Sequence, residues 1–130
     1  MPLMLTIDGA AIVDIPSLYT ELNRVFMENV DWTLGESLDA LDDMLYGGYG
    51  TLHGHQHAVV VWRDAQASRA ALGTAATRQW LLHKLQQPGT FNTALIARQL
   101  DALADGTGPT YFELIEQVFA DHPDIELRYA

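Results

Sequence analysis

Short apolar runs alternate with helical patterns along the chain. Apolar residues at helical spacing, bounded by capping or breaking residues, predict helices over residues 15–26, 35–45, 64–72 and 111–120. Compact runs of apolar and β-branched residues predict strands over residues 3–7, 58–62 and 125–129. Because helices separate these strands, we expect them to pair in parallel, with 58–62 as a central strand covered on both faces.

Residues 74–108 carry two further apolar patterns, divided by Pro88-Gly89. They predict two more helices, which form a helical insertion before the last helix. A chain of 130 residues, of which 48% are hydrophobic, has the size and composition of one domain with one core. We therefore expect residues 1–130 to form a single α/β domain, a small three-stranded parallel sheet packed with helices.

The composition excludes some classes of function and favours others. Lys and Arg total 7 against 17 Asp and Glu, a net charge of −10, which argues against nucleic-acid binding and favours cationic partners or simple solubility. The chain has no cysteine, which excludes disulfide bonds, metal sites with thiolate ligands and a cysteine nucleophile. A protein without cysteine is typical of a reducing compartment. Neither a signal peptide nor an apolar run of about 20 residues is evident, so we expect a cytoplasmic protein without membrane association.

The predicted helix 35–45 has two unlike faces. On a helical wheel its apolar residues gather on one side, and its carboxylates gather on the other. These carboxylates, which we call the acidic ridge, are Glu36, Asp39, Asp42 and Asp43. Like charges at this spacing destabilise a helix slightly, and no Lys or Arg occurs between Arg24 and Arg63. We expect the ridge to face solvent or a cationic partner, unless a cation folds in from elsewhere.

Two other patterns carry weaker indications. His53, His55 and His57 could bind a divalent metal, which makes a metal-binding protein one hypothesis. A glycine-containing loop needs no metal to explain it, however, and we expect neither a metal nor a cofactor. Asp42 and Asp43 are adjacent carboxylates, but neighbouring helix positions point about 100° apart and no convergent nucleophile is evident, so we do not expect an enzyme.

Residues 35–45, Gly-Glu-Ser-Leu-Asp-Ala-Leu-Asp-Asp-Met-Leu, resemble a motif of the barstar family. The family motif reads Gly-Glu-Asn-Leu-Asp-Ala-Leu, then a variable residue, Asp and an apolar pair. Further similarity lies in Ile7-Asp8-Gly9, Val61-Trp62-Arg63 and Asp124-Ile125. The resemblance implies a barstar-like fold and an immunity-type inhibitor without catalytic activity, which binds a basic, extracellular-type ribonuclease in a 1:1 complex.

The resemblance also implies which residues bind. Members of the family lay an acidic helix and its preceding loop across the active site of a small basic ribonuclease, where carboxylates replace substrate phosphates. Asp39 and Asp43 match the two motif aspartates, so Asp43 would enter the phosphate site and Asp39 would pair with cations beside it. The other expected partner-binding residues are Trp32, Thr33, Leu34, Gly35, Glu36, Asp42, Tyr46, Gly48, Tyr49 and Glu116.

The chain departs from the family pattern at three contact positions. Aromatic residues of the best-known member correspond here to Thr33, Asp42 and Gly48. Since buried aromatic residues supply much of the binding energy of interfaces, either Trp32, Tyr46 and Tyr49 substitute or the partner differs. The alternative is therefore a barstar-fold module that binds another basic protein, such as a non-nuclease toxin or a regulatory partner. The insertion 74–108 either extends the interface or packs on the sheet.

Overall fold

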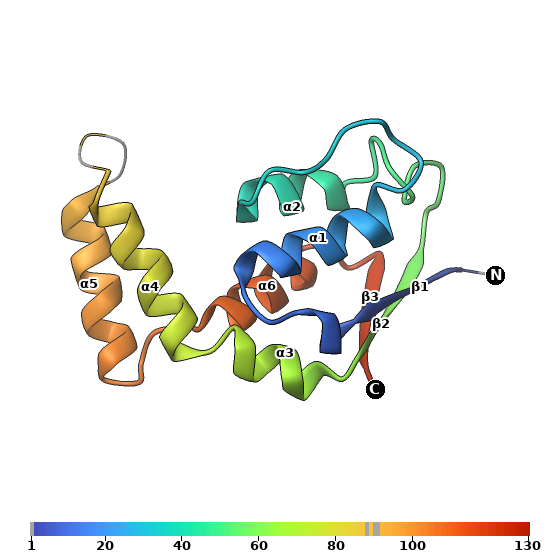
Figure 1. Ribbon diagram of the computed structural model, residues 1–130. Helices are drawn as coiled ribbons and strands as arrows, with labels where there is room; N and C mark the ends of the chain where they lie inside the picture. Colours follow the sequence, from blue (N-terminus) through green and yellow to red (C-terminus); the bar gives the residue numbers. More distant parts are fainter. Residues whose placement is uncertain (1, 88, 90–91) are drawn as a thin grey trace.

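The structure is a computed structural model that describes residues 2–87, 89 and 92–130 (Figure 1). Its strands are β1 (Leu3–Asp8), β2 (Ala58–Arg63) and β3 (Ile125–Tyr129). Its α-helices are α1 (Ile15–Phe26), α2 (Leu38–Leu45), α3 (Ala65–Ala71), α4 (Thr74–Leu85), α5 (Thr93–Ala104) and α6 (Tyr111–Ala120), and a 3₁₀ turn, η1, covers Gly9–Ala11. Each predicted element is present. Pro88, where we divided the two inserted helices, lies outside the described residues.

The three strands form one parallel sheet in the order β1-β2-β3, so β2 is central as predicted. Helices α1, α2 and α6 lie against one face of the sheet (Figure 1). The other face carries exposed side chains, among them Met4, Glu126 and Arg128. The prediction that β2 is covered on both faces is therefore wrong. Val59 is nevertheless buried on the open face, because β1 and β3 flank it on either side.

Trp62 lies at the centre of the core. Its ring is fully buried, with centroids 5.2 Å from Phe112 and 6.5 Å from Phe119. The buried Ser68 hydroxyl accepts a hydrogen bond from Trp62 Nε1 and donates one to the Gly9 carbonyl, each over 2.9 Å. These bonds satisfy the indole and tie α3 to the end of β1, which fixes the sheet edge without leaving a polar group unpaired.

Helices α4 and α5 form a hairpin with a small core of its own, made of Leu81, Ile96 and Leu103. Trp80 joins the hairpin to the rest of the molecule, with its ring edge-on to Tyr111 at 4.8 Å. The Thr77 hydroxyl accepts the Tyr111 N–H over 2.7 Å, at the first turn of α6. The two helices predicted within residues 74–108 are thus present, and they pack on the start of α6 and stand away from the sheet (Figure 1).

Candidate functional site

The motif helix begins three residues later than predicted. Ser37 is the N-cap of α2, because its backbone is extended and its hydroxyl accepts the Ala40 N–H over 3.0 Å. Serine favours this position since its side chain satisfies a backbone donor that has no partner within the helix. Glu36 therefore lies before α2, and the prediction that it belongs to the helix is wrong. Asp39 takes the first turn, where the helix dipole stabilises a negative charge.

The two faces of α2 are as the helical wheel predicted. Leu41 and Met44 are fully buried, and Leu45 is buried beside them. Asp39 and Asp43 are exposed on the opposite side, one helical turn apart. These two aspartates therefore present their charges to solvent on a rigid element whose other face is anchored in the core.

An aromatic pair lies beside Asp43. The Tyr49 hydroxyl donates a hydrogen bond to Asp43 Oδ2 over 2.9 Å. Partial burial and this bond to a carboxylate together raise the pKa of Tyr49 to about 12. The Trp32 ring lies with its centroid 4.8 Å from that of Tyr49. We call Trp32 and Tyr49 the aromatic platform; it joins the loop before α2, the loop after α2 and the helix itself.

Hydrogen bonds from α1 hold both loops of the platform. Asn23 Oδ1 accepts the Leu34 N–H over 2.7 Å, and the Leu34 side chain is buried. After α2, the Thr51 N–H donates to the Phe26 carbonyl over 2.8 Å. Leu34, which we expected at the interface, is thus a buried anchor of its loop.

Asp42 has a partner that the sequence did not reveal. His122 Nε2 lies 2.7 Å from Asp42 Oδ1, and His122 itself is only 7% exposed. The exposed Tyr46 packs edge-on against the His122 ring at 4.6 Å. The pair joins α2 to the residues after α6, 80 positions later in the chain. Asp42 is therefore held by a residue distant in the sequence, whereas Asp43 is bonded to Tyr49 of the neighbouring loop.

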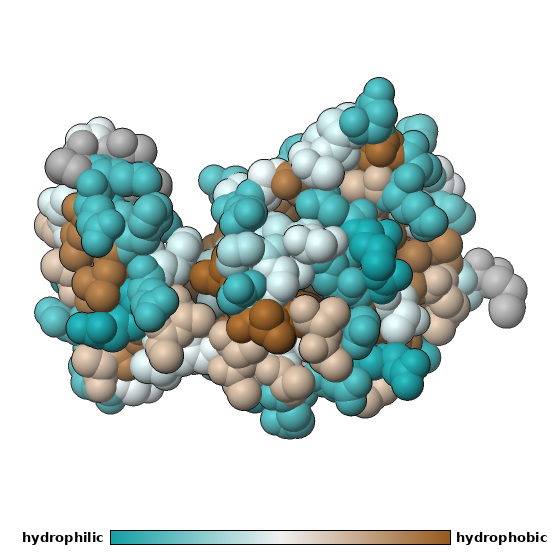
Figure 2. Space-filling view, viewed as in Figure 1, coloured by the Kyte–Doolittle hydropathy of each residue, from teal (hydrophilic) through white to brown (hydrophobic). Residues whose placement is uncertain are grey.

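The remaining predicted residues are spread over different surfaces. Thr33, Gly35 and Gly48 are exposed in the loops around α2. Glu36 and Asp39 line a cleft that faces the hairpin, where Figure 2 shows a hollow between the hairpin and the rest of the molecule. Glu116 accepts a hydrogen bond from Tyr129 at the end of β3. A hydrogen bond to α2 thus comes from His122, after the last helix, whereas Glu116 is bonded to the last strand.

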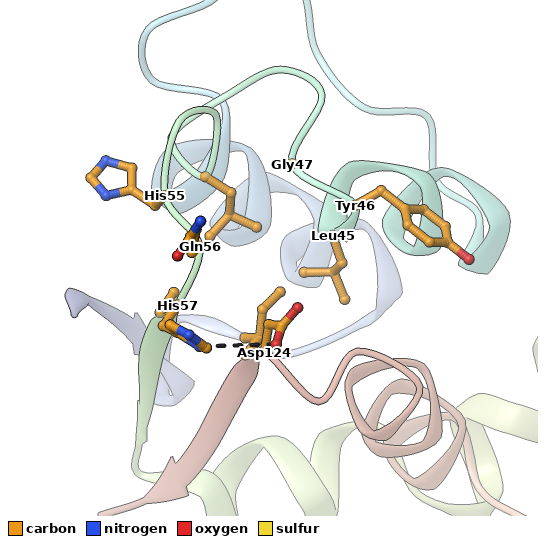
Figure 3. Close-up of a pocket in the computed structure, with 10 residues that line it drawn as sticks. Leu45, Tyr46, Gly47, His55, Gln56, His57 and Asp124 are labelled. Carbon is orange, nitrogen blue, oxygen red and sulfur yellow. Dashed lines mark ion pairs between the residues drawn. The ribbon is translucent and has the colours of Figure 1, made fainter.

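The histidine loop borders a different cavity, of about 490 Å³, next to the end of α2 (Figure 3). His57 Nδ1 lies 3.9 Å from Asp124 Oδ1, whereas His55 points away from this pair (Figure 3). Among the described residues, no three His, Cys, Asp or Glu side chains are grouped as metal ligands would be. The geometry thus gives the metal-binding hypothesis no support. Within the same residues, no helix is long and apolar enough to cross a membrane.

Comparison with known protein families decides the assignment. A family model described as "Barstar (barnase inhibitor)" matches residues 3–91, which is more than half of the chain. This chain belongs to the barstar family. The match includes the α2 motif and both of its flanking loops and extends through α4, whereas α5, α6 and β3 lie beyond it. A search of curated proteins finds no match.

Membership of the barstar family carries a general function. The family is one of inhibitors, which implies protein binding of the barnase-inhibitor type and not catalysis. The α/β fold with its three-stranded parallel sheet agrees with this membership.

Proposed function

We propose that this barstar-family protein inhibits a basic ribonuclease by covering the active site of the enzyme with α2 and the loop before it. The observation that supports this most directly is the exposure of Asp39 and Asp43, one turn apart on an anchored helix. Ribonucleases bind phosphates with cationic groups, and carboxylates at the right spacing can occupy the same positions through charge-assisted hydrogen bonds. The complex contains one copy of each protein.

The two aspartates have different roles in this proposal. Asp43 enters the phosphate site, because Tyr49 already holds its carboxylate in one direction and less freedom is lost on binding. Asp39 pairs with cations at the rim of the active site. The net charge of −10 attracts a basic enzyme over distance and accelerates the encounter.

The aromatic platform supplies the apolar part of the interface. Trp32 is 46% exposed and lies next to the carboxylate that enters the active site. An aromatic residue that becomes fully buried in a complex contributes strongly to affinity. Trp32 and Tyr49 therefore replace the aromatic residues that the best-known member has at the positions of Thr33, Asp42 and Gly48.

The experiment is calorimetric titration with barnase and with other basic ribonucleases, at low and at moderate salt, with nuclease activity followed in the same samples. The proposal predicts 1:1 binding that weakens as salt rises, together with loss of activity at the same stoichiometry. Binding without any loss of activity would contradict active-site occlusion.

A second candidate function is binding of a basic protein that is not a nuclease. The pairing of Asp42 with His122 supports it, because a polar intramolecular contact stands where the best-known member of the family has an aromatic residue. Affinity capture with the wild-type protein and with Asp43→Ala in parallel separates the two candidates. This second function is favoured if the wild type, but not Asp43→Ala, retains a basic protein and that captured protein has no nuclease activity.

A further inference from the structure

We propose that the α4–α5 hairpin gives the acidic surface a second wall, and that the cleft between them receives an arginine side chain of the basic partner. The inference rests on the proposed function, since it names a contact that the same partner makes. The cleft has a volume of about 500 Å³. Its lining includes Glu36 and Asp39 on one side, Lys84 of α4 and Gln87 just after that helix on the other, and Trp80 and Tyr111 between them.

The cleft already holds a cation of the protein itself. Lys84 Nζ lies 4.0 Å from the centroid of the Trp80 ring. Asp39 lines the same cleft as Lys84. Burial lowers the pKa of Lys84, and the negative charge of Asp39 acts in the opposite direction. An aromatic face and a carboxylate thus form a cation site in which the occupant is Lys84.

The charge of this site exceeds what Lys84 neutralises. Glu36 and Asp39 contribute two carboxylates against one ammonium. Tyr111, which lines the cleft, has a raised pKa mainly because it is buried, and the negative charge of Glu36 adds to the rise. The remaining negative charge is complementary to a second cation.

Arginine fits this site better than lysine does. Its planar guanidinium stacks on an aromatic ring and forks between two carboxylates, whereas an ammonium makes point contacts. The ring that it would stack on is fixed, because Trp80 packs on both the main core and the hairpin core. Lys84 and the incoming arginine therefore compete for the face of Trp80 and for the charge of Asp39.

The test uses N-acetyl-arginine amide as the probe and follows the Trp80 indole N–H by NMR, with N-acetyl-citrulline amide as the uncharged probe of the same shape. Lys84→Met removes the ammonium, which competes for Asp39 and is the group that holds this side chain over the Trp80 ring. Arg78→Met is the matched control, because it makes the same change of charge on an exposed position of α4 that does not line the cleft.

We expect the arginine probe to shift the Trp80 indole and to bind Lys84→Met about five-fold more tightly than the wild type, with Arg78→Met unchanged. An equal gain in affinity in both variants, an equal response to the citrulline probe, or no shift of the Trp80 indole signal would overturn the inference.

This outcome does not depend on binding of the nuclease. If barnase binds and the arginine probe does not, the arginine site in the cleft is rejected and the proposed function is retained. If the probe binds and barnase does not, the arginine site is retained and barnase is rejected as the partner.

Discussion

The Tyr49 hydroxyl donates a hydrogen bond to Asp43 Oδ2 over 2.9 Å, from a loop that the end of α1 holds in place. The bond restricts the Asp43 carboxylate to one direction, and the Trp32 ring restricts Tyr49 in turn. A binding group that is ordered before the encounter loses less entropy on complex formation. The geometry of the proposed phosphate mimic is therefore set by residues outside α2.

Removal of this hydroxyl tests the role of the platform. Tyr49→Phe keeps the ring beside Trp32 and deletes the bond to Asp43. We expect ribonuclease binding to weaken about 5- to 30-fold, or about 1–2 kcal/mol, because part of the free energy of a hydrogen bond to a charged group is lost. Calorimetry measures the affinity, and thermal unfolding checks that stability is retained. Unchanged affinity would show that Tyr49 does not position Asp43 for binding.

Asp42 should behave as a structural residue. Asp42→Ala leaves the buried His122 without its partner, so we expect the free energy of unfolding to fall by about 1–3 kcal/mol. Asp39→Ala, on the exposed side of the same helix, should change it by less than about 0.5 kcal/mol. Urea denaturation at neutral pH compares the two variants. Equal stability of both would contradict the assigned role of the Asp42–His122 contact.

Glu21 makes folding sensitive to acid. Burial disfavours its charge, but hydrogen bonds from Arg24 and from the Asp8 N–H prevail and hold its pKa below the ordinary value. A carboxylate with a lowered folded-state pKa stabilises the fold above its unfolded pKa of about 4.3, and this contribution is lost as pH falls through the folded pKa.

Glu21→Gln should therefore lower the free energy of unfolding at pH 7 by about 1–2 kcal/mol and flatten its decline below about pH 4.5. Urea denaturation from pH 7 to pH 3 measures both effects. An acid limb as steep as that of the wild type would show that other carboxylates cause the loss of stability.

Gly50 and Gly48 provide a matched pair in the loop after α2. Gly50 has φ of +79°, and a Cβ there would lie 2.4 Å from the Phe26 carbonyl oxygen, whereas a Cβ at Gly48 would meet nothing within 4 Å. Gly50→Ala should cost at least about 2 kcal/mol of stability, and Gly48→Ala should cost less than about 0.5 kcal/mol. Chemical denaturation compares them. Similar losses at both positions would contradict the account of how this loop is anchored.

The strands and helices were predictable because each carries a local pattern of apolar spacing and capping residues. Errors arose where the pattern is ambiguous. A β-branched run such as residues 58–62 does not distinguish a strand covered on both faces from one shielded by neighbouring strands. By spacing alone, Ser37 fits either the interior of a helix or its N-cap. The hydrogen bond that its hydroxyl accepts from the Ala40 N–H shows that it is the N-cap.

The site was predictable in part. The buried stripe of α2 fixes the outward direction of Asp39 and Asp43, so helical periodicity sufficed for them. His122 carries no periodic signal that relates it to Asp42, 80 positions earlier, and only the fold brings them together. Lys84 and Trp80 stand four positions apart on one helix, a spacing that indicates contact, but their position opposite Asp39 depends on how the hairpin packs on α6.

Calorimetry of Asp39→Ala and Asp43→Ala with barnase tests the central claim most directly. Asp101→Ala, an exposed aspartate on α5, is the control; Asp14 is unsuitable because it caps α1. Loss of one member of an interfacial charge pair should weaken binding about 30-fold or more at each α2 site, with little change for Asp101→Ala. Equal affinities for all three variants would contradict an interface centred on α2.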